Sequence, residues 1–171
     1  MQSLPEWRMF LELCEMYLKK HEIKNPIVVE LGVKRNKQKR FYEELLGAEH
    51  IGIDISDRSG IPDILGNTHD PETMEALKKK LQGRPINILF IDACHFYEDV
   101  KQDFEMYEPL CSDIIVLHDI MLHRREVGKF WGELRKKARK GIEEYRNFLF
   151  LSIYQHRKDN LQLGIGIIIK T

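Results

Sequence analysis

The sequence predicts an α/β fold in which a doubly wound, mostly parallel sheet of about seven strands ends in an antiparallel hairpin. Short apolar runs rich in β-branched residues follow one another along the chain, with helical or turn-rich segments between them. This alternation is the pattern of parallel strands joined by right-handed crossovers. The last two apolar runs, at 148–154 and 163–170, have no helix between them, so we expect them to pair as a hairpin.

In the first half of the chain, each predicted element has a recognisable boundary. Apolar side chains recur at helical spacing over 7–18, which predicts an amphipathic helix that ends before Pro26. The β-branched run at 27–31 is typical of a buried parallel strand. A second helix over about 37–46 is closed by Gly47, a residue that favours helix C-termini. Two further strands are predicted at 50–55 and 63–65.

The second half continues the alternation. Asp70 and Pro71 form a favourable cap and first-turn pair for the next helix. Residues 86–92 are the most strand-like run, and 113–119 is a second strand of the same kind. Apolar residues at helical spacing predict a helix that begins near Tyr97 and another over 127–138.

Composition and length limit the class of protein. The chain has 171 residues, 27 basic against 27 acidic side chains, and a hydrophobic content of 43%. These values are typical of one globular domain, with an N-terminal helix over 1–25 and the α/β core over 26–171. A dedicated nucleic-acid binder would usually be basic, and no apolar run approaches the ~18 residues of a membrane span. Three cysteines without a CxxC pair favour reduced thiols and a cytoplasmic location.

Ligands of doubly wound sheets bind at the carboxyl ends of the strands, so the residues at those ends are the candidates for a site. The end of the first strand contains Glu30 and Leu31 and is followed by Gly32. The second strand ends in Asp54, a carboxylate that is suited to ribose hydroxyls. A pyrophosphate cradle would need glycines near Lys34 and Lys37, so a nucleoside without pyrophosphate, such as S-adenosylmethionine, is favoured over NAD. In the alternative interpretation, Glu30 and Asp54 only end strands in solvent.

A second group of candidates lies at the ends of the later strands. Asp92 and Asp119 end neighbouring strands that are ~4.8 Å apart, and two converging carboxylates repel unless a cation, a proton or a base lies between them. His95, three residues after Asp92, is a natural general base for deprotonating a hydroxyl. The alternatives are that both carboxylates face water without a metal and that His95 only caps the helix that starts near Tyr97.

Several motifs resemble the successive motifs of class I S-adenosylmethionine-dependent methyltransferases. Within this group, the sequence is most similar to the small-molecule O-methyltransferases related to cephalosporin hydroxylase-like proteins, and the resemblance covers residues from about 5 to 170. The family has a Rossmann-like sheet with an antiparallel C-terminal strand. The motifs are VVELGV, HIGIDIS, ILGNTHDPETMEALKK, ILFIDACHFYEDVKQDFEMYEPL, IIVLHDI and LGIGIII.

The resemblance implies roles for residues at the first three strand ends. Glu30 and Gly32 would lie against the methionine part of the cofactor, Asp54 would bind the ribose, and Asn67 would hydrogen-bond the adenine. Family members usually have small residues where this chain has a charged loop, so Lys34, or Arg35 next to it, is a candidate for binding the cofactor carboxylate. The same loop is also compatible with a site that has lost activity.

The resemblance also implies a divalent metal held by Asp92, His118 and Asp119, with Asp92 next to the cofactor as well. Mg²⁺ suits oxygen ligands, whereas a histidine ligand favours Mn²⁺ or another transition metal. His118 and Asp119 are adjacent, and consecutive side chains of a regular strand point to opposite faces. Both can therefore bind one ion only if the strand has already ended.

The function that the sequence favours is a metal-assisted S-adenosylmethionine-dependent O-methyltransferase acting on a small-molecule or sugar hydroxyl. Two alternatives remain: an inactive nucleoside-binding or S-adenosylmethionine-binding module of the same fold, and a metal-dependent enzyme of nucleotide or phosphate metabolism. Nucleic-acid and membrane partners are not expected. The chain has little room for a substrate lid, so a homo-oligomer in which a second subunit completes the site is expected.

Overall fold

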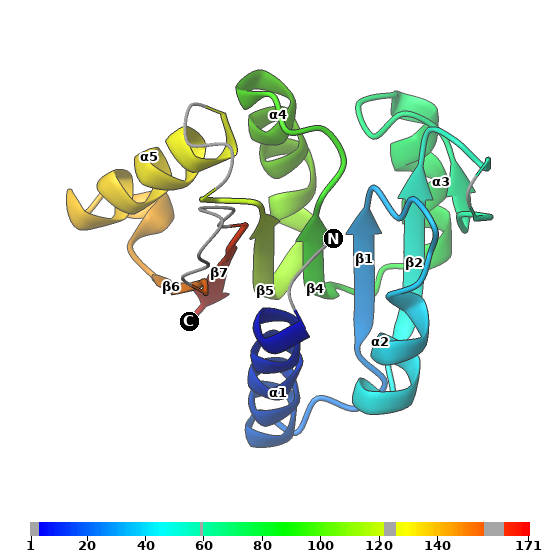
Figure 1. Ribbon diagram of the computed structural model, residues 1–171, viewed down its shortest axis with the longest axis horizontal. Helices are drawn as coiled ribbons and strands as arrows, with labels where there is room; N and C mark the ends of the chain where they lie inside the picture. The colour runs from blue at the N-terminus through cyan, green and yellow to red at the C-terminus, as the bar shows by residue number, and fades with distance from the viewer. Residues whose placement is uncertain (1–3, 59, 122–125, 156–162) are drawn as a thin grey trace.

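The computed structural model describes residues 4–58, 60–121, 126–155 and 163–171. Within these ranges, strands and helices alternate largely as the sequence predicts (Figure 1). The strands are β1 (Ile27–Leu31), β2 (Glu49–Asp54), β3 (Ile64–Leu65), β4 (Ile86–Ile91), β5 (Cys111–His118), β6 (Phe148–Ile153) and β7 (Ile165–Lys170). The α-helices are α1 (Leu4–Lys20), α2 (Lys39–Leu46), α3 (Pro71–Leu81), α4 (Tyr97–Tyr107) and α5 (Val127–Arg139). The sequence did not predict two short 3₁₀ helices, Glu108–Leu110 and Glu143–Tyr145.

The strands form one sheet of seven, in the order β3-β2-β1-β4-β5-β7-β6. The pairs among β1 to β5 are parallel, and β7 is antiparallel to both β5 and β6. The predicted Rossmann-like, mostly parallel sheet with an antiparallel C-terminal pair is therefore confirmed. The polar turn expected between β6 and β7 lies outside the described residues.

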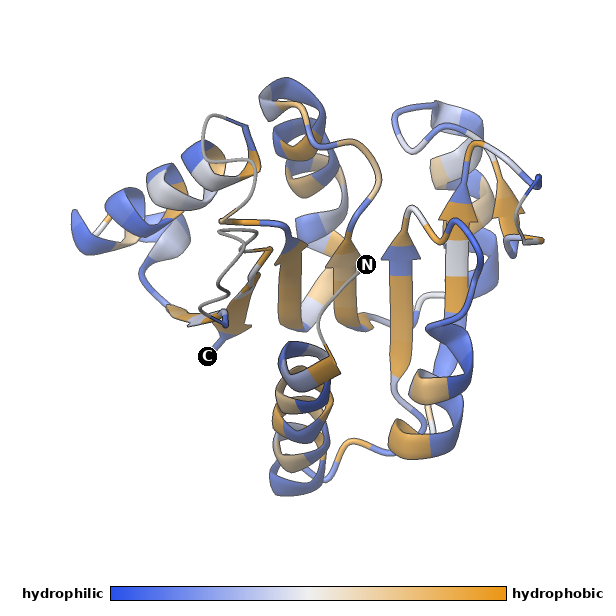
Figure 2. Cartoon of the chain, viewed as in Figure 1, coloured by the Kyte–Doolittle hydropathy of each residue, from blue (hydrophilic) through white to orange (hydrophobic). Residues whose placement is uncertain are grey.

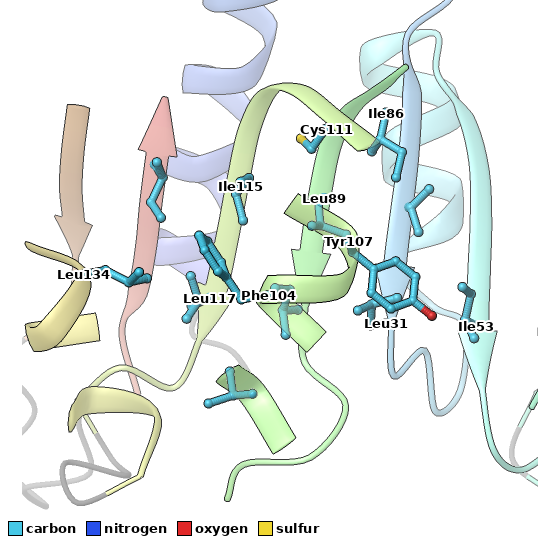
Figure 3. Packing of buried hydrophobic residues seen from close by; sticks show 14 of the residues in the cluster. Leu31, Ile53, Ile86, Leu89, Phe104, Tyr107, Cys111, Ile115, Leu117 and Leu134 are labelled. Atoms are coloured by element: carbon cyan, nitrogen blue, oxygen red, sulfur yellow. The ribbon is translucent and has the colours of Figure 1, made fainter. Parts of the chain in front are cut away.

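Helices cover both faces of the sheet, α1 and α2 on one side and α3, α4 and α5 on the other (Figure 1). The strands are hydrophobic over most of their length, whereas the helices carry hydrophilic residues on their outer surfaces (Figure 2). This pattern follows from burial of the central strands on both faces. Phe104 and Tyr107 of α4 pack on the sheet side chains Leu31 and Leu89 (Figure 3). None of the described helices is long and apolar enough to cross a membrane.

The strand order reverses between β1 and β4, and this switch point brings four strand ends to one edge of the sheet. Gly32, directly after β1, adopts a left-handed φ of 86°, and its N–H donates to Ile53 O at 2.8 Å. A Cβ at Gly32 would collide with the carbonyl oxygen of Asp92 and would lie 2.5 Å from Ala93 Cα. Glycine is therefore required here, because only glycine lets the loops after β1 and β4 approach this closely.

Gly32→Ala should destabilise the protein by about 2–5 kcal/mol, because the methyl group adds steric overlap to the cost of a left-handed alanine. Gly83→Ala is the matched control, since Gly83 has a φ of 80° but open space around its Cβ position. The control should lose only about 1–2 kcal/mol. Urea unfolding measures both values, and equal losses would show that the close approach to the β4 loop carries no energetic weight.

Candidate metal and cofactor site

Four ionisable side chains converge where β4 and β5 end. Asp92 follows the last residue of β4, His118 is the last residue of β5, and Asp119 comes next. His118 Nδ1 lies 3.0 Å from Asp92 Oδ1 and 3.0 Å from Asp119 Oδ1. His95 Nε2 lies 3.3 Å from Asp92 Oδ1 and 3.2 Å from Asp119 Oδ2. Each imidazole therefore contacts both carboxylates.

The backbone at the end of β5 explains how two consecutive residues reach one point. His118 is the last paired residue of the strand, opposite Ile165 of β7. Asp119 has a φ of 58°, in the left-handed region, so the alternation of the strand is broken at this residue. The condition that the sequence sets for joint use of His118 and Asp119, a strand that has already ended, is met.

The four groups change one another's protonation. The contact with Asp119, followed by the contact with Asp92, raises the pKa of His95 to about 9. Burial lowers the pKa of His118, but its contacts with Asp119 and Asp92 outweigh burial and raise the pKa to about 10. Burial raises the pKa of Asp92 and Asp119, and the two imidazoles overcome this effect and bring both below the usual value. Without a metal, the cluster at neutral pH therefore consists of two carboxylates and two imidazolium ions.

The donor atoms already have a spacing that suits a metal ion. Asp92, His95 and His118 each offer a ligand atom, and these three atoms lie within 4.8 Å of one another. Metal–ligand bonds of about 2.0–2.2 Å place neighbouring donors about 3.0–3.4 Å apart, which matches the contacts in the cluster. This group of three shares Asp92 and His118 with the predicted ligand set, and it contains His95 in place of Asp119. A mixed nitrogen and oxygen set favours Mn²⁺ and other transition metals over Mg²⁺.

Asp54 lies at the same edge, at the end of β2, and shapes the loop after β1. Its Oδ2 accepts a hydrogen bond from Lys34 N at 2.7 Å, and its Oδ1 accepts one from Ser56 N at 2.9 Å. Each carboxylate oxygen has a further lone pair, so the side chain retains acceptor capacity for ribose hydroxyls. Lys34 itself has a φ of 49°. Its side chain is exposed, so its ammonium group is accessible to solvent and to a ligand beside Asp54.

The side chain of Glu30 lies in the interior of the protein and not at its surface. Its side chain has no exposed area, and its Oε2 lies 2.9 Å from Nε2 of His50, which is equally buried. Burial raises the pKa of Glu30, and the contact with His50 opposes this effect. His50 Nδ1 lies 3.7 Å from Asp63, which in turn forms an ion pair with Lys39 at 2.9 Å. In this conformation the Glu30 side chain therefore lies in the interior of the protein, where it contacts His50.

Sequence reasoning missed His50 and Asp63. A histidine inside an otherwise apolar strand was the available signal, because a buried imidazole needs a polar partner. Its partners come from β1 and from the loop before β3, and sequence periodicity does not report such cross-strand contacts.

The predicted adenine residue, Asn67, lies in the loop between β3 and α3. Its Oδ1 accepts a hydrogen bond from His69 N at 3.1 Å. The same loop begins beside the proposed ribose carboxylate, because Gly66 N donates to Asp54 O at 2.9 Å. The structure therefore brings Asn67 into the neighbourhood of Asp54, on a loop that follows β3, whereas the cluster of Asp92, His95, His118 and Asp119 follows β4 and β5.

Comparison with known proteins identifies the family at this point. A family model described as "Methyltransferase domain" matches residues 29–120, which include every candidate residue named above. The chain belongs to this methyltransferase-domain family. No curated protein matches the chain.

Solved methyltransferase structures share the fold at low sequence identity. MycE from the mycinamycin biosynthetic pathway, in complex with Mg, SAH and mycinamycin VI, is 16% identical with a TM-score of 0.64, and the match covers 91% of this chain. The chain spans about half of MycE, 48% of its length. The plantazolicin methyltransferase BpumL, in complex with SAH, is 10% identical with a TM-score of 0.61 over 98% of this chain and 86% of BpumL. An O-methyltransferase from Bacillus cereus, also with SAH, is 10% identical with a TM-score of 0.59 over 95% and 81% of the two chains.

The affinity for Mn²⁺ should rise with pH, by up to about 100-fold per pH unit between about pH 7 and 9. The reason is that the pKa of His95 is about 9 and that of His118 about 10. An ion that binds His118 and the two carboxylates that face His95 therefore displaces one proton from each imidazole. Calorimetric titration in buffers of different ionisation enthalpy measures both the affinity and the released protons. Asp92→Asn should flatten this dependence, and a pH-independent affinity of the wild-type protein would contradict the assignment.

Proposed function

We propose that the chain is an S-adenosylmethionine-dependent methyltransferase that methylates a hydroxyl oxygen of a small molecule or sugar with the help of a divalent metal ion. The observation that carries this proposal is the convergence of Asp92, His95, His118 and Asp119 at the switch-point edge of a methyltransferase-family sheet. The similar structures MycE and the Bacillus cereus O-methyltransferase, which hold SAH, support the choice of cofactor. MycE also holds Mg, which supports a metal.

The residues proposed to bind the cofactor lie along the edge of the sheet where the parallel strands end. Asp54 would accept hydrogen bonds from the ribose hydroxyls, because its oxygens keep lone pairs after binding the amides of Lys34 and Ser56. Asn67 would meet the adenine and the Lys34 ammonium group the carboxylate. Gly32 would leave room for the methionine part, with the buried Glu30 beneath it and Asp92 beside it.

The cluster of Asp92, His95, His118 and Asp119 would assist methyl transfer to oxygen by holding a divalent ion and by accepting a proton. Asp92, His118 and Asp119 would hold a divalent ion, and His95 is close enough to share it or to move a proton. When bound, such an ion supplies Lewis acidity that lowers the pKa of a hydroxyl group. In the transfer step, the hydroxyl oxygen forms a bond to the methyl carbon, the bond from that carbon to sulfur breaks, and SAH leaves.

His95 would receive the proton from the acceptor. In the metal-free cluster its contacts with Asp119 and Asp92 keep it protonated at neutral pH. Once these carboxylates share a cation, they stabilise the imidazolium ion less, and the pKa of His95 returns toward the usual value of about 6.5. His95 is the most exposed of the four side chains, at 30%, and is therefore the best placed to meet an acceptor.

The cysteines bear on the proposed cellular location of the enzyme, and the uncovered acceptor side of the site bears on its proposed oligomeric state. Cys14 and Cys111 are buried and Cys94 is half-buried, and all three are free, which favours a reducing cytoplasm. The proposed acceptor is a small molecule rather than nucleic acid or a membrane component. A second copy of the chain would complete the acceptor side, which makes the enzyme a homo-oligomer in this proposal.

Asp54→Asn should weaken SAH binding by about 10- to 100-fold, because hydrogen bonds from ribose to a charged acceptor are lost. Asp57→Asn, which changes an exposed carboxylate nearby, is the matched control and should bind as the wild type does. Isothermal calorimetry with and without Mn²⁺ measures both. Absence of SAH binding by the wild-type protein at about 1 mM would reject the proposed function.

His95→Gln should leave SAH binding intact and lower turnover by at least about 100-fold, as expected for loss of a general base. SAH release from S-adenosylmethionine in the presence of a panel of small hydroxyl compounds measures turnover. His21→Gln, at an exposed position on the opposite side of the fold, is the control. Unchanged turnover in His95→Gln would remove His95 from the mechanism while leaving the class of enzyme in place.

A further inference from the structure

A second polar cluster joins the loop after β3 to α4, outside the metal cluster. His69 Nε2 lies 3.2 Å from Asp103 Oδ1, and the Asp103 side chain has no exposed area. On its other side, His69 Nδ1 lies 3.9 Å from Asp99 Oδ1. Asp99 and Asp103 are four residues apart on α4, so they stand one above the other on a single face of the helix. The imidazole of His69 thus lies between two carboxylates of the same helix face.

A third residue of that helix face extends the contact. Tyr107, one turn beyond Asp103, donates its hydroxyl to the carbonyl oxygen of Thr68 at 2.8 Å. Thr68 and Asp103 are both buried. The loop is therefore attached to α4 through adjacent residues, by a backbone carbonyl at Thr68 and by a side chain at His69.

His69 also orients the residue expected at the adenine. Its backbone N–H donates to Asn67 Oδ1 at 3.1 Å, and Asp70 N donates to Asn67 O at 3.0 Å. At its start the loop is joined to the strand that ends in the proposed ribose carboxylate, since Gly66 N donates to Asp54 O. The loop thus runs from Asp54 to α4, and His69 fixes its far end.

The same helix face contacts the loop that carries the metal ligands. Cys94 Sγ donates to Asp99 Oδ2 at 3.1 Å, and Cys94 lies between Asp92 and His95 in the sequence. Asp99 therefore touches the loop after β4 with one oxygen and faces His69 with the other. The first turns of α4 hold the two loops next to each other.

Burial gives the contact between His69 and Asp103 an energetic role. A buried carboxylate without a compensating partner costs several kcal/mol. Burial raises the pKa of Asp103, and the nearby Thr68 and His69 side chains oppose that rise. The His69 imidazole lies 3.2 Å from the buried Asp103 carboxylate and belongs to the loop, so its removal would loosen the loop where it meets the helix.

We propose that His69 is a positioning residue that acts through Asn67 and the 66–70 loop to hold the nucleoside part of the cofactor. This inference rests on the proposed function, because that function places the cofactor's nucleoside between Asp54 and this loop. His69 touches neither the metal ligands nor the reacting atoms. Its loss therefore weakens nucleoside binding and leaves metal binding unchanged.

The test compares two ligands on the full-length protein. Calorimetry gives dissociation constants for SAH and for adenosine, and Mn²⁺ binding is followed by electron paramagnetic resonance. His69→Leu should weaken both SAH and adenosine by at least about 10-fold and change Mn²⁺ affinity by less than about 2-fold. His69→Gln, whose longer side chain can bring an amide N–H to Asp103, should recover affinity to within about 3-fold of the wild type. Glu105→Gln, an exposed carboxyl on the same helix, is the control.

The outcomes separate this inference from the proposed function. Unchanged SAH affinity in His69→Leu overturns the inference while the function stands. An equal loss of SAH and Mn²⁺ affinity also overturns it, because a merely structural role would damage both sites. If His69→Leu does not fold by circular dichroism, His69→Asn, whose amide is too short to reach Asp103, replaces it in the same comparison. A wild-type protein that binds no SAH rejects the proposed function itself, and the inference with it.

Discussion

Two aspartates and two histidines share one small space at the ends of β4 and β5, and the surrounding structure depends on their mutual attraction. Partly buried carboxylates at this distance would repel each other strongly, because the effective dielectric constant is low. Both imidazoles contact both carboxylates, so two positive charges balance two negative ones. In the proposed metal site, binding of a cation would therefore release protons from the imidazoles.

A histidine also lies between two carboxylates at two other places in the structure. His50 of β2 lies between Glu30 of β1 and Asp63, and His69 lies between Asp99 and Asp103 of α4. In each case the histidine and the two carboxylates come from at least two different elements, so the contact forms only in the folded chain. Histidine contacts of this kind therefore recur where acidic side chains are drawn together by the fold.

Local sequence patterns determine much of this fold, and the strand ends are predictable for that reason. The positions of Asp54, Asp92 and Asp119 follow from apolar runs that end at these residues, and the parallel sheet brings the ends to one edge. The place of β7 between β5 and β6 is a matter of tertiary packing, since a hairpin pattern does not say which strand is the outer one. The burial of Glu30 also escaped prediction, because its partner His50 belongs to another strand.

The protonation state of the four-residue cluster determines the order of events in the proposed reaction. A histidine whose pKa is about 9 is already protonated at neutral pH and cannot accept a proton from a substrate. The contacts that raise this pKa come from Asp119 and Asp92, which are also the carboxylates assigned to the metal. In the proposed mechanism, His95 would therefore become a base only after these carboxylates bind a cation. Metal binding and proton acceptance would then be one coupled equilibrium, because the same two carboxylates hold the ion and set the pKa of His95.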